Sequence, residues 1–303
     1  MQANRIRFGY SDSIHLLPLL HPLQAGWVYP TGHQLDLVAL PAPELERALG
    51  AGELDGGLLD PLAYQRLRGA LEVMPGIGLA SDGPNGMAVL QSVTRPDDLD
   101  GQEVAVDPSA AGGVAAGLLA VLAPTYFSIA ITTAQADPPA RAGVPRLLAG
   151  DAAVRARLPW LLYEARFSPS TLAAEERALA KGRPLPTPAN PAPAPDPATA
   201  GWAEDLGAAW WILSGTPMVW ALGVLRRELL DQPETVVAIV RAFQQSRTAA
   251  QEQADTVRAA AAAQAGVPGA VVSAIFDRQT VELGASQQGG LAAFYAQAAR
   301  LRV

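Results

Sequence analysis

Short apolar runs alternate with stretches of helical character along much of the chain. Leu35–Leu40 is followed by Pro41–Gly50, a helical stretch with proline near its start and glycine near its end. Leu54–Leu59 and Glu103–Asp107 are further strand-like runs, and Ser109 is expected to cap an alanine- and leucine-rich helix. Strands that alternate with helices predict an α/β fold with a largely parallel sheet and helices on its faces.

The second half of the chain has a different pattern. Residues 184–197 carry seven prolines in fourteen positions, which predicts a surface excursion near the return from a second lobe. After Leu229 the chain is nearly all helical, with periodic runs at Thr235–Ala265 and Gln287–Leu301. We therefore predict two lobes, with residues 1–94 and 205–303 forming the first and residues 95–204 the second.

The composition is that of a globular protein and disfavours nucleic-acid binding and membrane spans. Half of the 303 residues are hydrophobic and 17% are charged, as in globular proteins, and the formal net charge of −7 disfavours a nucleic-acid partner. Cysteine is absent, and the N-terminus runs directly into the strand-like Arg5–Tyr10 with no leader pattern, so we expect a cytoplasmic protein. Two uncharged stretches, Ala110–Phe127 and Ala208–Leu225, contain glycine and proline and are expected to be buried elements rather than membrane spans.

Several sequence blocks, taken in order, carry a family resemblance. These are Gly52–Asp55 (G-E-L-D), Val106–Val114, Leu148–Ala153 (L-A-G-D-A-A) and Glu204–Trp220, which contains D-L-G-A-A-W and S-G-T-P-M-V-W. Their order resembles that of the chorismate dehydratases of menaquinone biosynthesis (the futalosine route). The opening block departs from the family, because Asp12, Ser13 and His15 stand where the family has serine, tyrosine and asparagine.

The resemblance implies a fold, a reaction and a site. The fold is that of type II periplasmic binding proteins, two α/β lobes with a ligand cleft between them and here a helical C-terminal region. The reaction is the loss of water from chorismate to give 3-enolpyruvylbenzoate, carried out by a hydro-lyase without a cofactor or a metal. His15 is the candidate catalytic residue, as a donor or base, with a satisfied structural histidine as the alternative.

The remaining candidates are substrate-binding residues that follow strand-like runs or begin helices. They are Ser11, Asp12, Asp60, Asn85, Gly86, Met87, Ser109, Gly112, Gly113, Glu164, Thr216 and Pro217. Ser109 and the two glycines after it suggest a helix N-terminus that faces an anion, or else a simple helix cap. Trp210 and Trp220 have the planar faces to stack on a ring, with core packing as the alternative.

Two other functions stay open. The sister enzyme that makes 1,4-dihydroxy-6-naphthoate shares the fold, but it normally has an early cysteine and a mid-chain histidine that this sequence lacks. A cytoplasmic paralogue that binds an organic anion without chemistry has the same fold, since function depends on the site. The oligomeric state, with a homodimer among the options, is not indicated by the sequence.

Overall fold

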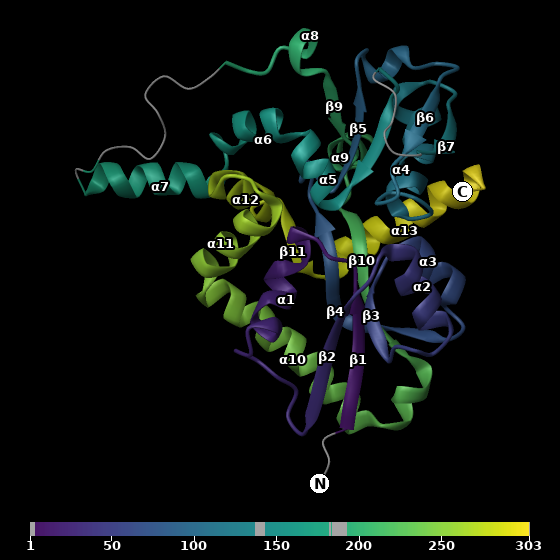
Figure 1. Cartoon of the computed structure of the whole chain (residues 1–303), viewed down its shortest axis with the longest axis vertical. Coiled ribbons are helices and arrows are strands. Elements are labelled where there is room, and N and C mark those ends of the chain that lie inside the picture. The colour runs from purple at the N-terminus through teal and green to yellow at the C-terminus, as the bar shows by residue number, and fades with distance from the viewer. Residues whose placement is uncertain (1–3, 137–142, 182, 184–192, 303) are drawn as a thin grey trace.

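Two β-sheets organise the chain, each with helices packed on it (Figure 1). The computed structural model describes residues 4–136, 143–181, 183 and 193–302. The predicted α/β architecture is confirmed. Of the expected proline-rich excursion at 184–197, residues 184–192 lie outside the described residues.

The larger sheet has six strands in the order β11-β4-β10-β3-β1-β2. Their bounds are β1 Asn4–Tyr10, β2 His33–Ala39, β3 Gly56–Leu59, β4 Leu71–Ser81, β10 Met218–Arg226 and β11 Gln279–Glu282. Strand β1 pairs in parallel with β2 and β3, whereas β10 is antiparallel to both β3 and β4. The segments 33–39 and 56–59 follow the βα alternation that the sequence predicts.

The smaller sheet has five strands in the order β7-β6-β8-β5-β9. Their bounds are β5 Ala88–Ser92, β6 Glu103–Val106, β7 Thr132–Gln135, β8 Arg146–Ala149 and β9 Trp202–Asp205. Strand β6 is parallel to β7 and β8, and β5 is antiparallel to β8 and β9. Both sheets are thus mixed rather than largely parallel, because β5 and β10 enter by crossing from the other sheet instead of through a βαβ unit.

The chain passes between the sheets twice, through residues 82–87 and 206–217. Asp205 holds the two crossings together: its carboxylate accepts hydrogen bonds from the amides of Asn85 (3.1 Å), Gly86 (2.7 Å) and Ala208 (3.1 Å). Strand β5 belongs to the smaller sheet although it precedes residue 94. The division into domains at residues 94 and 205 stays a prediction.

The helices pack against these sheets and against one another. Their bounds are α1 Leu17–Gln24, α2 Ala42–Gly50, α3 Pro61–Leu67, α4 Val114–Leu122, α5 Gly150–Ala156, α6 Leu158–Ala165, α7 Pro169–Ala180, α8 Pro197–Ala200, α9 Leu206–Ser214, α10 Pro233–Glu252, α11 Ala254–Ala265, α12 Gly269–Phe276 and α13 Ala285–Leu301. Short 3-10 helices lie at η1 Ile14–Leu16, η2 Pro96–Asp98 and η4 Arg227–Asp231, and α4 continues into a π-helical turn, η3, at Ala123–Phe127. The mostly helical C-terminal region is confirmed, interrupted by the short strand β11.

Aromatic side chains tie the sheets to their covering helices. The ring of Phe8 on β1 lies 4.6 Å from that of Phe243 on α10, and Trp210 on α9 makes an edge contact with Phe294 on α13 at 6.0 Å. Helix α13 therefore connects β10 of the larger sheet to α4, which packs on the smaller sheet, and to α9, which lies in the second crossing (Figure 1). The two uncharged stretches form buried elements, chiefly α4 and β10.

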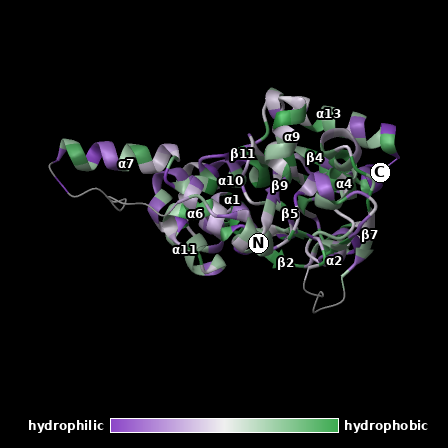
Figure 2. Ribbon diagram, turned by 90° about the horizontal axis from the view of Figure 1, so that it is seen from above, coloured by the Kyte–Doolittle hydropathy of each residue, from purple (hydrophilic) through white to green (hydrophobic). Residues whose placement is uncertain are grey.

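One helix stands away from this body. Helix α7 extends outward and carries hydrophilic as well as hydrophobic residues along its length (Figure 2). None of its residues is buried. Among the described residues no single helix is long and apolar enough to cross a membrane; α11 and α12 reach that length and composition only as a pair, bent by 114° at the break between them.

Candidate ligand-binding site

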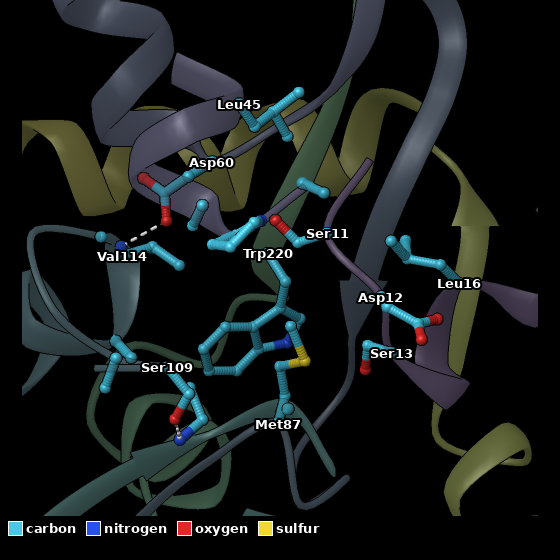
Figure 3. Close-up of a pocket in the computed structure, with 18 of the residues that line it drawn as sticks. Ser11, Asp12, Ser13, Leu16, Leu45, Asp60, Met87, Ser109, Val114 and Trp220 are labelled. Carbon is cyan, nitrogen blue, oxygen red and sulfur yellow. Dashed lines mark hydrogen bonds between the residues drawn. The ribbon is translucent and has the colours of Figure 1, made fainter. Parts of the chain in front are cut away.

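A cavity of about 610 Å³ lies between the two sheets. Residues 11–13, 39–42 and 58–60 line it from the larger sheet, and residues 108–111, 113–115 and 149–152 line it from the smaller one. These segments follow β1, β2, β3, β6 and β8, so the cavity lies at the carboxyl ends of the parallel strands, where open α/β sheets bind their ligands. Most of the lining is aliphatic (Figure 3).

Asp60 closes one end of the cavity by bonding to both sides of it. The residue ends β3 and caps α3, where Oδ1 accepts hydrogen bonds from the amides of Leu62 (2.8 Å) and Ala63 (3.3 Å). Its other oxygen, Oδ2, accepts a hydrogen bond from the amide of Val114, the first residue of α4 on the opposite side (Figure 3). Burial of the carboxyl raises its pKa to about 6, against the lowering effect of these amides and of Arg66.

Asp151 closes the other end of the cavity, with a carboxylate from the smaller-sheet side that bonds to residues of the larger-sheet side. It lies in the first turn of α5, next to the smaller sheet, and Oδ1 accepts hydrogen bonds from the hydroxyl of Ser13 (3.1 Å) and the amide of Ile14 (2.9 Å). Its Oδ2 accepts a hydrogen bond from Gln264 Nε2 at 3.3 Å, and the same nitrogen donates to Asp12 Oδ1 at 3.1 Å. On each side of the cavity, one carboxylate thus accepts a hydrogen bond from the first residue of a helix on the opposite side: Asp60 from Val114, and Asp151 from Ile14.

Trp220 supplies a flat apolar wall inside the cavity. Its side chain extends from the buried strand β10, and Nε1 donates to Ser81 Oγ at 2.9 Å, which fixes the ring (Figure 3). Met87, the last residue of the first crossing before β5, lies beside it in the same view. An aromatic face and a thioether between aliphatic walls suit a planar, largely apolar ring.

The polar groups left for a ligand are few. The hydroxyl of Ser13 is bonded to Asp151, and that of Ser109 donates to Asp107 at 2.7 Å and accepts from the amide of Ala149 at 3.2 Å. Within the described residues, the hydroxyl of Ser11 and the guanidinium of Arg155 have no hydrogen-bond or ion-pair partner, and both line the cavity. Arg155 is the only Lys, Arg or His among the described residues that line it.

Residues 202–300 match the family described as menaquinone biosynthesis. The predicted resemblance to proteins of menaquinone biosynthesis is confirmed over these residues, and the dehydratase reaction stays a prediction. The matched segment runs from β9 through α13, and it includes the Glu204–Trp220 block and the cavity-lining Trp220. A search of curated protein sequences gave no match.

Solved structures with the same fold cover nearly the whole chain. Protein AF1704 from Archaeoglobus fulgidus is 16% identical with a TM-score of 0.66, over 99% of this chain and 98% of that one. The alkanesulfonate-binding protein SsuA from Xanthomonas axonopodis pv. citri, bound to MOPS, is 19% identical with a TM-score of 0.60, over 99% and 95%. A Candida albicans protein described as having the generic periplasmic binding protein fold is 10% identical with a TM-score of 0.57, over 98% and 94%. The fold of this chain is therefore that of periplasmic binding proteins, as predicted.

The structure brings together part of the predicted site. The residues that line the cavity are Ser11, Asp12, Asp60, Met87, Ser109 and Gly113. The others, which do not line it, are His15, Asn85, Gly86, Gly112, Glu164, Thr216 and Pro217. The expectation that Ser11, His15, Asn85, Ser109 and Thr216 converge on one cleft is therefore wrong for three of the five.

His15 is buried inside the protein and does not line the cavity. Its side chain is fully buried, Nδ1 lies 3.0 Å from Gln279 Oε1, and Gln279 Nε2 donates to the backbone carbonyl of His15 at 2.9 Å. Gln279 Oε1 is therefore the acceptor and Nδ1 carries the proton, which leaves Nε2 as a buried acceptor without a protein partner among the described residues. Burial lowers the pKa of the imidazole, so it is neutral. In this conformation it cannot reach a ligand in the cavity.

Asn85, Gly86 and Glu164 belong to the crossings between the sheets. The amides of Asn85 and Gly86 point to Asp205 and not into the cavity, and Asn85 Oδ1 accepts from the amide of Met87 at 3.1 Å. Glu164 bonds to Arg157, which is buried and also lies 3.8 Å from Asp205. Burial raises the pKa of Glu164. These contacts connect the crossings between the sheets to Arg157 and Glu164.

Thr216, Pro217, Gly112 and Ser109 also differ from expectation. Thr216 bonds to Ser214 at the end of α9, and the carbonyl of Pro217 packs against Gly290 of α13. Ser109 is not a helix cap, because α4 begins at Val114 after a turn; Gly112, in that turn at φ +67°, accepts a hydrogen bond from Arg66 through its carbonyl. The helix start exists, but Asp60 occupies it.

Asp151 and Arg155 were not among the predicted site residues. Both lie in or just after the L-A-G-D-A-A block, and an acidic residue in the first turn of a helix that follows a strand was the available signal. Trp220 was weighed as a stacking residue and does line the cavity, whereas Trp210 packs in the core. In the described part of the chain, no group of three or more His, Asp or Glu side chains is placed to hold a metal ion.

Proposed function

We propose that the protein is an enzyme of menaquinone biosynthesis that dehydrates chorismate to 3-enolpyruvylbenzoate. The observation that carries this proposal is the family match over residues 202–300, which contributes Trp220 to the wall of the cavity. The cavity volume of about 610 Å³ lies in the usual range of small-molecule sites. Small-molecule binding also fits a fold that the alkanesulfonate-binding protein shares.

The cavity suits the substrate and the product of this reaction. Chorismate loses the ring hydrogen on the carbon that bears the enolpyruvyl ether, together with the neighbouring hydroxyl, and the ring becomes aromatic. One substrate gives one aromatic dicarboxylate and one water, so no electron acceptor is needed. The aliphatic walls and the fixed face of Trp220 accommodate the ring as it flattens, and they exclude water from the reacting carbons.

The proton is assigned to the substrate itself. Within the described residues, the carboxylates that line the cavity are Asp12, Asp60 and Asp151, and each already accepts a hydrogen bond from the protein. The enolpyruvyl carboxylate of chorismate lies next to the ring hydrogen and takes it as a base, and the departing hydroxyl receives a proton and leaves as water. The protein then acts by holding the substrate in this geometry.

The test is turnover of purified protein with chorismate, followed by chromatography for 3-enolpyruvylbenzoate. We expect one product per chorismate consumed, at a rate that a chelator such as EDTA does not change. Trp220→Ala should lower kcat/KM by about tenfold or more through loss of the ring wall, while Trp202→Ala, outside the cavity, serves as the matched control. Consumption of chorismate without the aromatic product would contradict the proposal.

A second candidate function is binding of an organic anion without chemistry. The burial of His15 favours it, since the one histidine that the resemblance placed in the site does not face the cavity. The same experiment separates the two: chorismate that binds in calorimetry and is recovered unchanged after prolonged incubation assigns the protein to this class.

A further inference from the structure

Two of the helix starts that border the cavity are already occupied by carboxylates of the protein. Helix α4 and the helical segment that starts at Ile14 both begin at the cavity, and their free amides are the natural partners of a carboxylate. Both starts are occupied within the protein, by Asp60 at Val114 and by Asp151 at Ile14. A ligand carboxylate cannot use these two starts, and the starts of α2 and α5, which also border the cavity and have no side-chain cap, offer amides but no net positive charge.

The negative charges that face the cavity oppose the binding of a ligand carboxylate. Asp12, Asp60 and Asp151 line it, and an anion that enters meets the field of these carboxylates. The net charge of the chain is −7, so the protein as a whole also repels an anion. Binding of a carboxylate requires a local positive charge that is not already neutralised.

Arg155 meets that requirement. It lies on α5, one turn beyond Asp151, and it is exposed where it borders the cavity. Its guanidinium has no hydrogen-bond or ion-pair partner among the described residues, in contrast to Arg66, which pairs with Glu46, and Arg157, which pairs with Glu164. A guanidinium binds a carboxylate through two parallel hydrogen bonds.

We propose that Arg155 anchors a carboxylate of the ligand and selects carboxylates over neutral rings of the same shape. The inference rests on the proposed function for the identity of the ligand, a cyclic dicarboxylate. Ser11, whose hydroxyl also has no partner in the described part of the chain, lines the cavity from the larger sheet and donates to the same ligand. Arg155 is thus a binding and specificity residue, and the chemistry takes place over Trp220.

The test compares Arg155→Gln, Arg155→Lys and a matched control, Arg177→Gln. Arg177 is an exposed arginine on α7 that does not line the cavity, so its replacement removes the same charge from the chain. Titration calorimetry uses three probes: chorismate, 3-enolpyruvylbenzoate and the neutral dimethyl ester of the latter. Thermal unfolding of each variant checks that the fold is intact.

We expect Arg155→Gln to weaken binding of both dicarboxylates by about tenfold to a hundredfold, the range of a charge-assisted hydrogen-bonded pair. Arg155→Lys should recover part of the loss because it keeps the charge without the bidentate geometry. The ester should bind the wild type and Arg155→Gln alike, and Arg177→Gln should stay within about twofold of the wild type in every titration. In turnover, the loss should appear in KM and not in kcat.

The outcomes separate this inference from the proposed function. Dicarboxylate binding that depends on Arg155, without turnover of chorismate, refutes the proposed reaction and keeps the anchor. Turnover with equal affinities in the wild type and Arg155→Gln overturns the anchor and keeps the reaction. A wild-type protein that binds neither dicarboxylate overturns both.

Discussion

At each end of the cavity an aspartate accepts a hydrogen bond from a helix start on the opposite side, but the other partners of the two carboxylates differ. At one end Asp60 is packed between the starts of α3 and α4, and backbone amides occupy both of its oxygens. At the other end Asp151, which is half-buried like Asp60, shares its oxygens among a hydroxyl, one amide and the exposed Gln264. Burial of the carboxyl raises the pKa of Asp60 to about 6.

The difference lies in the partners of one chemical group. Asp60 accepts hydrogen bonds from three backbone amides, which hold its carboxyl rigidly, and burial makes that carboxyl costly to ionise. Asp151 accepts from a hydroxyl and an exposed side-chain amide as well as from one backbone amide, and water replaces such side-chain partners more easily. We therefore expect the Asp60 end to hold the two sheets together and the Asp151 end to open for the ligand.

Removal of Asp60 should have the largest effect. Asp60→Ala takes away the cap of α3 and leaves the amide of Val114 without its acceptor across the cavity. Loss of a cap together with an unsatisfied amide predicts a decrease of about 2–3 kcal/mol in the free energy of unfolding. Urea denaturation measures the decrease, and kcat/KM for chorismate should fall at least about tenfold as α4 separates from α3.

Asp196→Ala is the control for this prediction. Asp196 caps the short helix α8 through the amide of Ala198 at 2.9 Å, and it is an exposed residue outside the cavity lining. Its loss should cost about 1 kcal/mol or less and leave turnover unchanged. Equal effects of the two replacements would mean that Asp60 is only a helix cap.

The pH dependence of stability should identify Asp60 as the titrating group. Its pKa is about 6 in the folded protein, against an ordinary value of 3.8 for an aspartate side chain, so between these values the folded state binds a proton that the unfolded state does not. The stabilisation is complete below the lower value and is lost as the pH rises through about 6. Arg66 on α3 and Tyr295 on α13 are the other ionisable groups that interact with it.

A comparison with Asp60→Asn isolates this contribution. The amide is neutral at every pH, so the wild type should gain about 1–2 kcal/mol relative to the variant between about pH 7 and pH 4, an amount reduced by solvent in the cavity. His15 acts in the opposite sense: burial lowers its pKa, so its contribution is present above its unfolded pKa and is lost as the pH falls. That contribution is common to both proteins and cancels in the difference, and a difference that does not change with pH would contradict the assignment.

The sequence predicted the local elements better than the contacts between distant ones. Pro41–Gly50 became α2 at Ala42–Gly50, and Leu35–Leu40 lies within or next to β2, because caps and hydrophobic runs act over a few residues. The helix start at Ser109 was misplaced, since the turn that delays α4 to Val114 is held by Asp60, 54 positions away. No periodicity in a single sequence carries that information.

His15 shows the same limit within the site. The resemblance implied a place for it in the site, but its partner Gln279 lies 264 positions along the chain, on a strand that reaches it only in the folded state. Ser11 and Asp12, four and three positions earlier in the same loop, do line the cavity. A shift of a few positions at the start of a helix thus decides between the cavity and the core.

Replacement of His15 should therefore affect stability more than turnover. His15→Ala removes a buried ring and leaves Gln279 Oε1 without its donor, which predicts a loss of about 1–3 kcal/mol in the free energy of unfolding. We expect kcat to stay within about threefold of the wild type, far less than the effect of removing a general base. A loss of about a hundredfold or more in kcat, the scale of acid–base catalysis, with an unchanged melting temperature would restore the catalytic assignment.

The smallest effect is expected from Asp151→Asn, which sharpens the comparison between the two ends. The amide oxygen still accepts from the amide of Ile14 or the hydroxyl of Ser13, and Gln264 is exposed enough to bond with water instead. The free energy of unfolding should fall by about 1 kcal/mol or less.

The change also removes one negative charge beside Arg155, so KM for chorismate should decrease by about two- to fivefold, the size of a partly screened interaction between charges. The double variant Asp151→Asn, Arg155→Gln is compared with Arg155→Gln alone. If Asp151 acts on the ligand through its charge alone, the added Asp151→Asn change should lower KM by a similar factor. If Asp151 acts by competing with the ligand for Arg155, the decrease in KM should be smaller. Steady-state kinetics at low and high salt measures both quantities, because a charge effect shrinks with ionic strength and a geometric one does not. A loss of stability as large as that of Asp60→Ala would show that both ends hold the sheets together and that the mouth of the cavity lies elsewhere.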